Sequence, residues 1–452
     1  MVCRFRTASN LGLASTNNLD NCMLNRHLPN LEKNLKKIFL VTLRVISFKY
    51  RKSISYFVQA VKSVKQNFVP SPEMLNLLDE FRKMVNDCIR IGLAENVTSL
   101  KTLSKKAYHQ LDRYDVPTYY RLTAISKATG ILRNYRKTLR KHPEAKKPWA
   151  SKLMLTDCYA FKIVNEKLRL PIGNREYTFI PLNGYVLRCI SGYTIRSVTL
   201  TACTLSIAFS KETVVADPKG LIGIDRNLGN ITVVDTERKT EKIDLSRATV
   251  IKENCRQAKR GFTRNDHRIQ QTIHSKYGRI QRNKVNWILH NTSSRIVEQA
   301  KTKQFGIVME NLKGIRKLYR KGNGQGRDYR ARLNSWSYYE LQRQIEYKAK
   351  WRGVPVIYVQ PHKTSSVCSI CGFPITECAE RKVYCPKCDK VMDRDENAAL
   401  NIVMAGLRFS LKGGTKEAVK GNGESLILRA DASQVTHHRR VTRTTLQLVE
   451  SQ

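Results

Sequence analysis

Two pairs of cysteines near the C-terminal end have the spacing of metal ligands. Two residues separate the members of each pair, and 13 residues separate the pairs, which are Cys368/Cys371 and Cys385/Cys388. Four thiolates in this pattern favour one structural Zn²⁺ ion in a closed tetrahedral site. Because such a site leaves no open position for water, any catalytic chemistry has to come from other residues.

Three acidic residues stand where predicted elements end or begin. Asp225 ends an apolar strand that starts at Leu221, Glu310 ends a strand over residues 305–309, and Asp395 opens a helix after the second cysteine pair. Carboxylates brought together from separate elements could bind two Mg²⁺ ions, the arrangement that supports phosphodiester cleavage by water. Asp393 competes with Asp395 for the third position, or is only the N-cap of that helix.

The order of these elements, strand–Asp, strand–Glu and Asp–helix, is the order expected of a ribonuclease-H-like nuclease core. A lone acidic residue at the end of a strand is usually a turn or solvated residue. The ordered trio, with the cysteine pairs directly before its third member, makes coincidence a poor explanation.

The charge of the chain predicts a polyanionic partner. Its 452 residues include 81 Lys and Arg against 37 Asp and Glu, a formal net charge of +44. Such a charge opposes folding unless a partner such as nucleic acid neutralises it. We find no basic amphipathic anchor for a membrane surface and no apolar run that could span a bilayer. We therefore expect a cytoplasmic, nucleoid-associated prokaryotic protein with reduced thiols, no membrane contact and no obligate protein partner.

Basic residues recur in two predicted helical stretches, residues 117–142 and 251–303. In the second stretch, Trp287 and Ile296 are predicted core positions. For any single cation, a solvated helix face is the simpler interpretation. Collectively, these stretches are candidates for phosphate contact. The chosen candidates are Arg136, Arg140, Arg260, Arg264, Arg268 and Arg282.

The remaining pattern predicts a β-domain interrupted by helices. A rough alternation over residues 56–68 indicates a strand, and a helix begins at Ser71-Pro72. Beyond residue 152, β-rich runs are separated by Asn/Gly turns, which favours an antiparallel barrel or sandwich. The runs comprise residues 159–163, 177–181, 185–190, 194–201 and 204–210.

Together, these motifs resemble the OrfB/TnpB family of insertion sequences, transposon-encoded RNA-guided nucleases related to type V CRISPR effectors. The resemblance covers roughly residues 58–407. One departure is the continuation Arg226-Asn227-Leu228-Gly229, where many family members carry Gly or Val soon after the first Asp. The matching motifs are Gly223-Ile224-Asp225, Val308-Met309-Glu310-Asn311-Leu312, Cys385-Pro386-Lys387-Cys388 and Asp393-Arg394-Asp395-Glu396-Asn397.

The resemblance implies a mixed fold: a RuvC-like catalytic domain of α/β type, an inserted zinc ribbon, and a β-barrel-like wedge domain interrupted by a helical recognition lobe. It implies that Asp225, Glu310 and Asp395 bind the catalytic Mg²⁺ ions. The predicted boundaries are a poorly ordered extension (1–55), wedge (56–70 and 149–215), recognition lobe (71–148), RuvC-like domain (216–362 and 391–407), ribbon (363–390) and flexible tail (408–452).

The function implied by the resemblance is RNA-guided cleavage of DNA. The guide RNA would come from the transposon end, and target DNA would be recognised by pairing with it. Two alternatives stay open: a transposase or recombinase that joins strands, and a non-catalytic zinc-ribbon protein that binds DNA or RNA. The intact acidic trio argues against the second alternative.

Overall fold

The computed structural model describes residues 56–173, 175–264, 266–319 and 324–411. The predicted extension over residues 1–55 and nearly all of the predicted tail lie outside these ranges. No helix in the described ranges is both long and apolar enough to cross a membrane.

An open antiparallel sheet forms the first β-region. Its order is β1-β7-β6-β2, comprising β1 (Tyr56–Asn67), β7 (Thr204–Val215), β6 (Thr194–Thr201) and β2 (Met154–Asp157). A smaller antiparallel sheet contains β3 (Lys162–Val164), β4 (Lys167–Pro171) and β5 (Tyr177–Pro181). The described strands therefore form two open sheets, and the expected barrel-like closure is not seen among them.

Helices fill the sequence between β1 and β2. They are α3 (Pro72–Ala94), α4 (Leu100–Ala107), the 3₁₀ turn η1 (His109–Arg113) and α5 (Tyr119–Leu139). The Ser71 side chain caps α3 by accepting a hydrogen bond from the Met74 amide, as its sequence predicts. Since β1 and β2 belong to one sheet, the helices interrupt a β-region in the chain.

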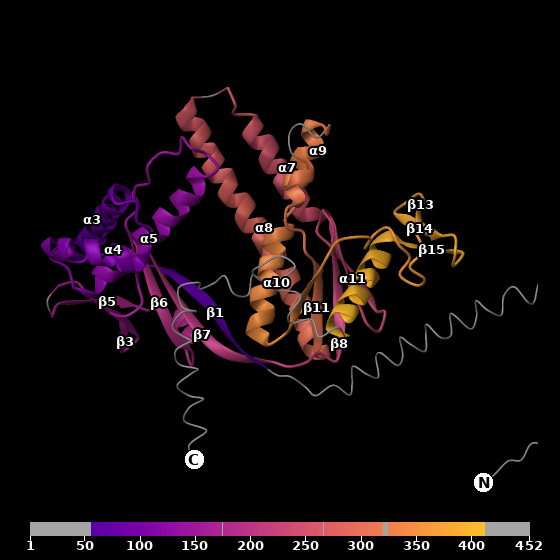
Figure 1. The fold of residues 1–452 in the computed structure, drawn as a ribbon, viewed down its shortest axis with the longest axis horizontal. Coiled ribbons are helices and arrows are strands. Elements are labelled where there is room, and N and C mark those ends of the chain that lie inside the picture. The colour runs from indigo at the N-terminus through magenta and orange to yellow at the C-terminus, as the bar shows by residue number, and fades with distance from the viewer. Residues whose placement is uncertain (1–55, 174, 265, 320–323, 412–452) are drawn as a thin grey trace, which may run out of the picture. The chain divides into compact units, whose positions relative to one another are not determined.

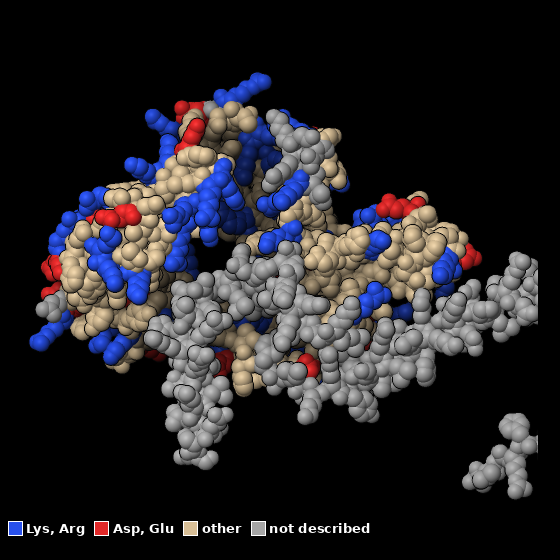
Figure 2. All heavy atoms as spheres, in the orientation of Figure 1, with Lys and Arg blue, Asp and Glu red and all other residues tan. Residues whose placement is uncertain are grey.

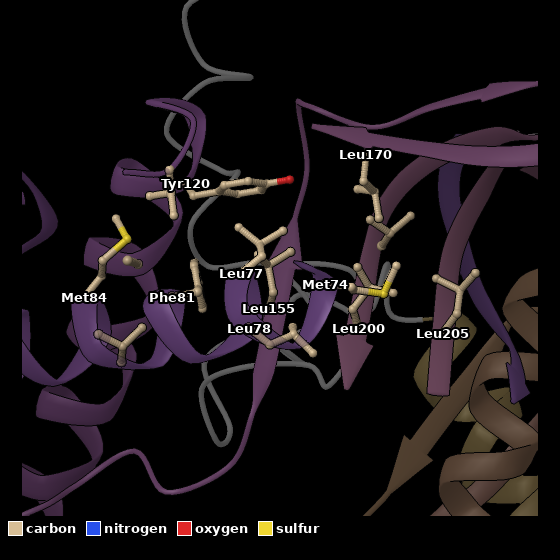
Figure 3. Packing of buried hydrophobic residues seen from close by; sticks show 14 of the residues in the cluster. Met74, Leu77, Leu78, Phe81, Met84, Tyr120, Leu155, Leu170, Leu200 and Leu205 are labelled. Atoms are coloured by element: carbon tan, nitrogen blue, oxygen red, sulfur yellow. The ribbon is translucent and has the colours of Figure 1, made fainter. Parts of the chain in front are cut away.

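These helices and both small sheets share one hydrophobic core (Figure 3). Phe81 of α3 meets the ring of Tyr120 of α5 edge-on, with 6.4 Å between the centroids. The Tyr120 hydroxyl donates to the carbonyl of Pro171 in β4 at 2.8 Å, which satisfies a polar group that would otherwise be buried unpaired. Leu155 of β2 is fully buried in the same cluster.

The predicted strand over residues 185–190 is wrong. These residues form the helix α6 (Gly184–Ile190), whose first turn is capped by Asn183. The Asn183 side chain accepts a hydrogen bond from the Val186 amide at 2.8 Å. Asn183-Gly184 is therefore a helix start, where the sequence pattern had indicated a hairpin turn.

A five-stranded sheet forms the second β-region, with order β10-β9-β8-β11-β12 (Figure 1). Strands β8 (Gly220–Arg226), β9 (Asn230–Asp235) and β10 (Thr240–Asp244) form an antiparallel meander. Strands β11 (Phe305–Glu310) and β12 (Val356–Val359) lie parallel to β8. Helices connect the parallel strands, as parallel pairing requires.

Helices cover both faces of this sheet. One face packs against α7 (Ser246–Arg260), α8 (His267–Lys303) and α10 (Tyr338–Arg352), and the other against α11 (Arg394–Leu411). Alternate residues of β8 divide between the faces: Ile222 joins the first cluster and Leu221 the second. The connection before α10 contains η2 (Ile315–Tyr319) and α9 (Arg327–Asn334).

The predicted helical stretch over residues 251–303 is two helices, α7 and α8. Ile296 is fully buried, as predicted, but Trp287 is 63% exposed and its prediction as a core residue is wrong. The buried residues of α8 begin at Val285. Trp287 follows Val285 by two positions, and residues two apart on a helix point to different sides.

Gly223 provides a test of the packing between β8 and α11. A Cβ at this position would lie 2.5 Å from the Ala399 carbonyl oxygen and 2.6 Å from Val403 Cγ2. We expect Gly223→Ala to lower the free energy of unfolding by about 1–3 kcal/mol, because the helix must move off the sheet. Gly229→Ala is the control, since nothing lies within 4 Å of its Cβ position. Equal urea midpoints for the two variants would contradict this close approach.

Candidate active site

Asp225 and Glu310 lie at the carboxyl ends of two adjacent parallel strands. The register pairs Ile224 of β8 with Met309 of β11, so the acidic residue after each follows at the same level. Because side chains alternate along a strand, Asp225 shares the face of Gly223, and Glu310 shares that of Val308. Gly223 and Val308 both pack against α11, so they lie on the same face of the sheet. Two predicted ligands therefore meet on one side of one sheet edge.

Asp395 reaches this edge from the first turn of α11, which begins beside β15 (Lys390–Asp393; Figure 1). Its side chain is almost fully buried, and Asn230 of β9 donates to its Oδ2 at 3.5 Å. Asp393 has a different role. Its Oδ1 accepts from the amides of Asp395 and Glu396 at 3.0 Å each, and its Oδ2 accepts from Lys242 Nζ at 2.7 Å. These contacts match the helix N-cap interpretation.

Two of the carboxylates act electrostatically on the third. Burial, followed by the charges of Glu310 and Asp395, raises the pKa of Asp225 to about 7. A buried carboxyl group beside two further carboxylates suits a cation, and the donor atoms of all three are the hard oxygens that Mg²⁺ prefers. The donor set thus fits divalent metal ions.

The acidic trio does not form a compact single-ion site like that of the cysteines. Within the described ranges, the four cysteines are the one group of three or more His, Cys, Asp or Glu that could hold a metal ion, and their ligand atoms all lie within 4.8 Å of one another. Two ions about 3.5–4 Å apart do not require every carboxylate to bind the same ion. The trio is therefore compatible with two ions, and a single ion shared by all three residues is not favoured.

Three side chains to which the sequence alone gives no role hold the acidic residues in place. Arg226, only 3% exposed, donates to the Glu310 carbonyl and to Gln342 Oε1 of α10. The Thr364 hydroxyl donates to Glu310 Oε1 at 2.6 Å. Arg381 Nη2 donates to Asp395 Oδ1, also at 2.6 Å. Arg226, in the stretch that departs from the family pattern, therefore holds the backbone of Glu310 through buried hydrogen bonds.

The four cysteines form the predicted metal cluster. Cys371 and Cys385 place their sulfur atoms 3.5 Å apart, and Cys368 and Cys388 place theirs 3.9 Å apart. The cluster borders an antiparallel sheet of β13 (Thr376–Glu377), β14 (Lys382–Cys385) and β15. It could hold one zinc ion in a closed site, as expected for a zinc ribbon.

The ribbon is tied directly to the helix that carries Asp395. Strand β15 ends at Asp393 and α11 begins at the next residue. Asn397 of α11 is 1% exposed; its Oδ1 accepts from the Ser369 amide and its Nδ2 donates to the Val367 carbonyl, both at 2.8 Å. The position of Asp395 thus depends on the cysteine-bearing loops.

The six arginines predicted to contact nucleic acid are all exposed. Arg136 and Arg140 lie at the end of α5, Arg260 ends α7, Arg264 follows it, and Arg268 and Arg282 lie on α8. Figure 2 shows Lys and Arg side chains gathered over these helices, with few acidic side chains among them. The structure places these cations at the surface but does not join them to the acidic site.

Comparison with known proteins identifies the family. A TnpB-like protein of Methanocaldococcus jannaschii is 31% identical over 267 residues, which cover 54% of this chain and 91% of that protein. The chain belongs to the TnpB-like family. InsQ of Escherichia coli K12, provisionally named an RNA-guided DNA endonuclease, is 26% identical over 54% of this chain and 66% of its own length.

Other matches relate this TnpB-like chain to the Cas12f nucleases. The CRISPR-associated endodeoxyribonuclease Cas12f2 of a Micrarchaeota archaeon is 33% identical over 27% of this chain, but only 24% of that nuclease is covered. The family model described as Cas12f1-like, TNB domain, matches residues 338–402, which run from α10 through the cysteine cluster into α11. A solved Cas12f1–sgRNA–target DNA complex shares the fold, with a TM-score of 0.53 and 16% identity over 74% of this chain and 83% of that one.

Proposed function

We propose that the protein is an RNA-guided DNA endonuclease that hydrolyses phosphodiester bonds at a RuvC-like, Mg²⁺-dependent site. The observation that carries this proposal is the placement of Asp225, Glu310 and Asp395. In a TnpB-like chain, they converge from two parallel strand ends and one helix start onto the same face of a sheet.

The three carboxylates would hold two Mg²⁺ ions. When bound, such a pair neutralises charge on the entering and leaving oxygens of the phosphodiester. The protein's own part is to keep the carboxylates oriented. Thr364 fixes the Glu310 carboxylate, Arg226 fixes its backbone, and Asp393 fixes the start of the helix that bears Asp395. The four cysteines would hold a structural zinc ion that anchors this helix start.

The proposed partners are a guide RNA from the transposon end and a target DNA. Base pairing would read the sequence, while the protein would hold backbone and shape. The net charge of +44 and the exposed arginines on α5, α7 and α8 support this division of roles. In this proposal, residues 216–362 and 391–407 form the RuvC-like domain, 363–390 the ribbon, 56–70 and 149–215 the wedge, and 71–148 the recognition lobe.

Reconstitution tests the proposal. The protein is combined with RNA transcribed from the DNA flanking its gene, and with plasmids that carry a guide-matched sequence beside randomised flanks. We expect Mg²⁺-dependent cutting of matched plasmids only. Failure to cut any matched plasmid, with RNA bound and Mg²⁺ present, would overturn it. Joining of labelled DNA ends in place of cutting would support the recombinase alternative.

Thr364 offers a second test, because it touches Glu310 without being one of the proposed ligands. Thr364→Val keeps the side-chain shape and removes the hydroxyl donor, so the Glu310 carboxylate loses its orienting contact. We expect the cleavage rate to fall about ten- to hundredfold, as for other residues that orient metal ligands. Thr364→Ser retains the hydroxyl and is the matched control. Equal initial rates for the Val and Ser variants would show that this hydrogen bond is unimportant.

A further inference from the structure

A cationic trough lies around Trp351, and none of its lining residues belongs to the acidic site. It consists of two cavities of about 470 Å³ and about 510 Å³ that share Lys62, Ser63 and Trp351. No Asp or Glu lines either cavity. The lining cations come from β1, α6 and α10 and comprise Lys62, Lys65, Arg188, Arg343, Lys348 and Arg352.

The ring of Trp351 attracts two ammonium groups, that of Lys62 from the trough lining and that of Lys211, which lines neither cavity. Lys62 Nζ lies 4.3 Å from the ring centroid and Lys211 Nζ lies 4.8 Å from it. Tyr193 and Phe209 pack against the same ring, with centroid distances of 5.1 and 5.7 Å. Cation–π attraction thereby fixes two like charges around one packed ring.

Lys348 adds a third cation without a carboxylate partner. Its Nζ donates to three neutral oxygens of α8: the His290 carbonyl at 2.6 Å, Ser293 Oγ at 2.7 Å and Ser294 Oγ at 2.8 Å. Across the described residues, no ion pair within 4 Å involves Lys62, Lys211 or Lys348. By contrast, Arg343 pairs with Glu340 and Arg352 with Glu298.

Lys62 and Lys348 of the trough are half-buried and lie close to other cations, which disfavours their charged forms. Burial and the charge of Arg352 lower the pKa of both Lys62 and Lys348, the latter to about 8. Half-buried cations that repel one another gain the most from a bound anion, because the anion offsets both burial and repulsion. A lone inorganic anion would meet only part of the lining, whereas a strand with repeated phosphates can follow both cavities.

We propose that this trough binds the phosphodiester backbone of a nucleic-acid strand. The inference rests on the proposed function, because it places one of its nucleic-acid partners. Lysine ammonium groups and arginine forks are the side chains that bind phosphate oxygens most strongly. The strand is the RNA or the DNA of the complex, and the two sources are separated by experiment.

The test removes one central cation and measures binding without Mg²⁺, so that no cleavage occurs. The probes are fluorescein-labelled RNA transcribed from the DNA flanking the gene, and duplex DNA of matched length presented to the RNA-loaded protein. Anisotropy titrations over a series of KCl concentrations give the dissociation constant and its salt slope. The variants are Lys62→Gln, the charge-retaining Lys62→Arg, and Lys239→Gln, at an exposed lysine in the turn between β9 and β10 that lies outside the trough.

For the strand that occupies the trough, Lys62→Gln is expected to weaken binding about tenfold, the loss typical of one charged hydrogen bond. The slope of log K against log salt should become shallower by about 0.7–0.9, the value for one phosphate contact. Lys62→Arg should restore both quantities. Arg188→Gln, at an exposed position in the other cavity, should act in the same direction and does not disturb the packed Trp351 ring.

The two probes identify the strand. Weaker binding of RNA alone places the RNA in the trough, and weaker binding of DNA alone places the target there. If neither Lys62→Gln nor Arg188→Gln differs from Lys239→Gln with either probe, the inference is overturned. The proposed function would still stand in that case, provided that the wild-type complex cuts matched DNA.

Discussion

Asp225→Ala is expected to lower the rate of matched-DNA cleavage by about a thousandfold or more, which is the scale of losing a central group of a preorganised site. The residue is the last but one of β8, where burial and two neighbouring carboxylates raise its pKa to about 7. Replacing it removes one of the three carboxylates that would hold the proposed metal ions. The remaining acids, Glu310 and Asp395, cannot replace an oxygen that comes from the middle strand of the sheet.

The measurement compares the wild-type protein with the Asp225→Ala variant, first by initial cleavage rate at saturating Mg²⁺ and then by affinity for the RNA. RNA affinity should be unchanged, because Asp225 lines neither cavity of the cationic trough. Asp115→Ala is the matched control, since it removes the same charge from an exposed position. If Asp225→Ala and Asp115→Ala cut matched DNA equally fast, the acidic trio is not the reaction site.

The sequence could predict that Asp225 and Glu310 lie together, because the ends of the two strands can be recognised in it. Apolar runs that stop at Asp225 and Glu310 fix where each strand ends, and parallel strands connected by helices bring those ends to one edge. The face was predictable too, since residues two apart share a side. For the third acid, the cysteine pairs and the small residues mark a helix start but leave Asp393 and Asp395 both open, and the family resemblance favours Asp395.

The supporting residues could not be predicted in this way. Arg381 comes from a turn of the ribbon and Thr364 from the loop before the first cysteine, so their contacts depend on how the ribbon folds back on α11. Short elements were also misread. Asn183-Gly184 fits a hairpin turn and a helix start equally well, and only the packing of α6 decides between them.

The cationic trough shows a further limit of sequence reasoning. Lys62, Arg188 and Lys348 come from segments far apart in the chain, and the sequence alone does not show that they line one trough. The candidate arginines chosen from basic runs are instead exposed helix residues. A basic run in the sequence therefore identifies a cationic surface. A cavity lined by cations from distant segments can be recognised only once the tertiary fold is known.

Cys385→Ser is expected to destabilise the ribbon and, through it, the acidic site. Cys385 is fully buried in the four-cysteine cluster, and replacing one thiolate should cost several of the roughly 10–16 kcal/mol that structural zinc can contribute. We expect the variant to lose zinc and to unfold at a lower temperature. Cleavage should fall as well, because the helix that carries Asp395 begins directly after the ribbon strand β15.

Cys378→Ser is the control variant. It shows whether the effects of Cys385→Ser come from losing a metal ligand or from replacing any cysteine of the ribbon. Cys378 lies in the same ribbon but is exposed and outside the cluster, so its replacement should keep one zinc ion per chain and the wild-type melting temperature. Metal content is measured by emission spectrometry, and unfolding by calorimetry. Full zinc content with unchanged melting in Cys385→Ser would exclude a zinc site at the cluster. Loss of zinc with normal cleavage would instead show that Asp395 is held without the ribbon, by Asp393 and the packing of α11 on the sheet.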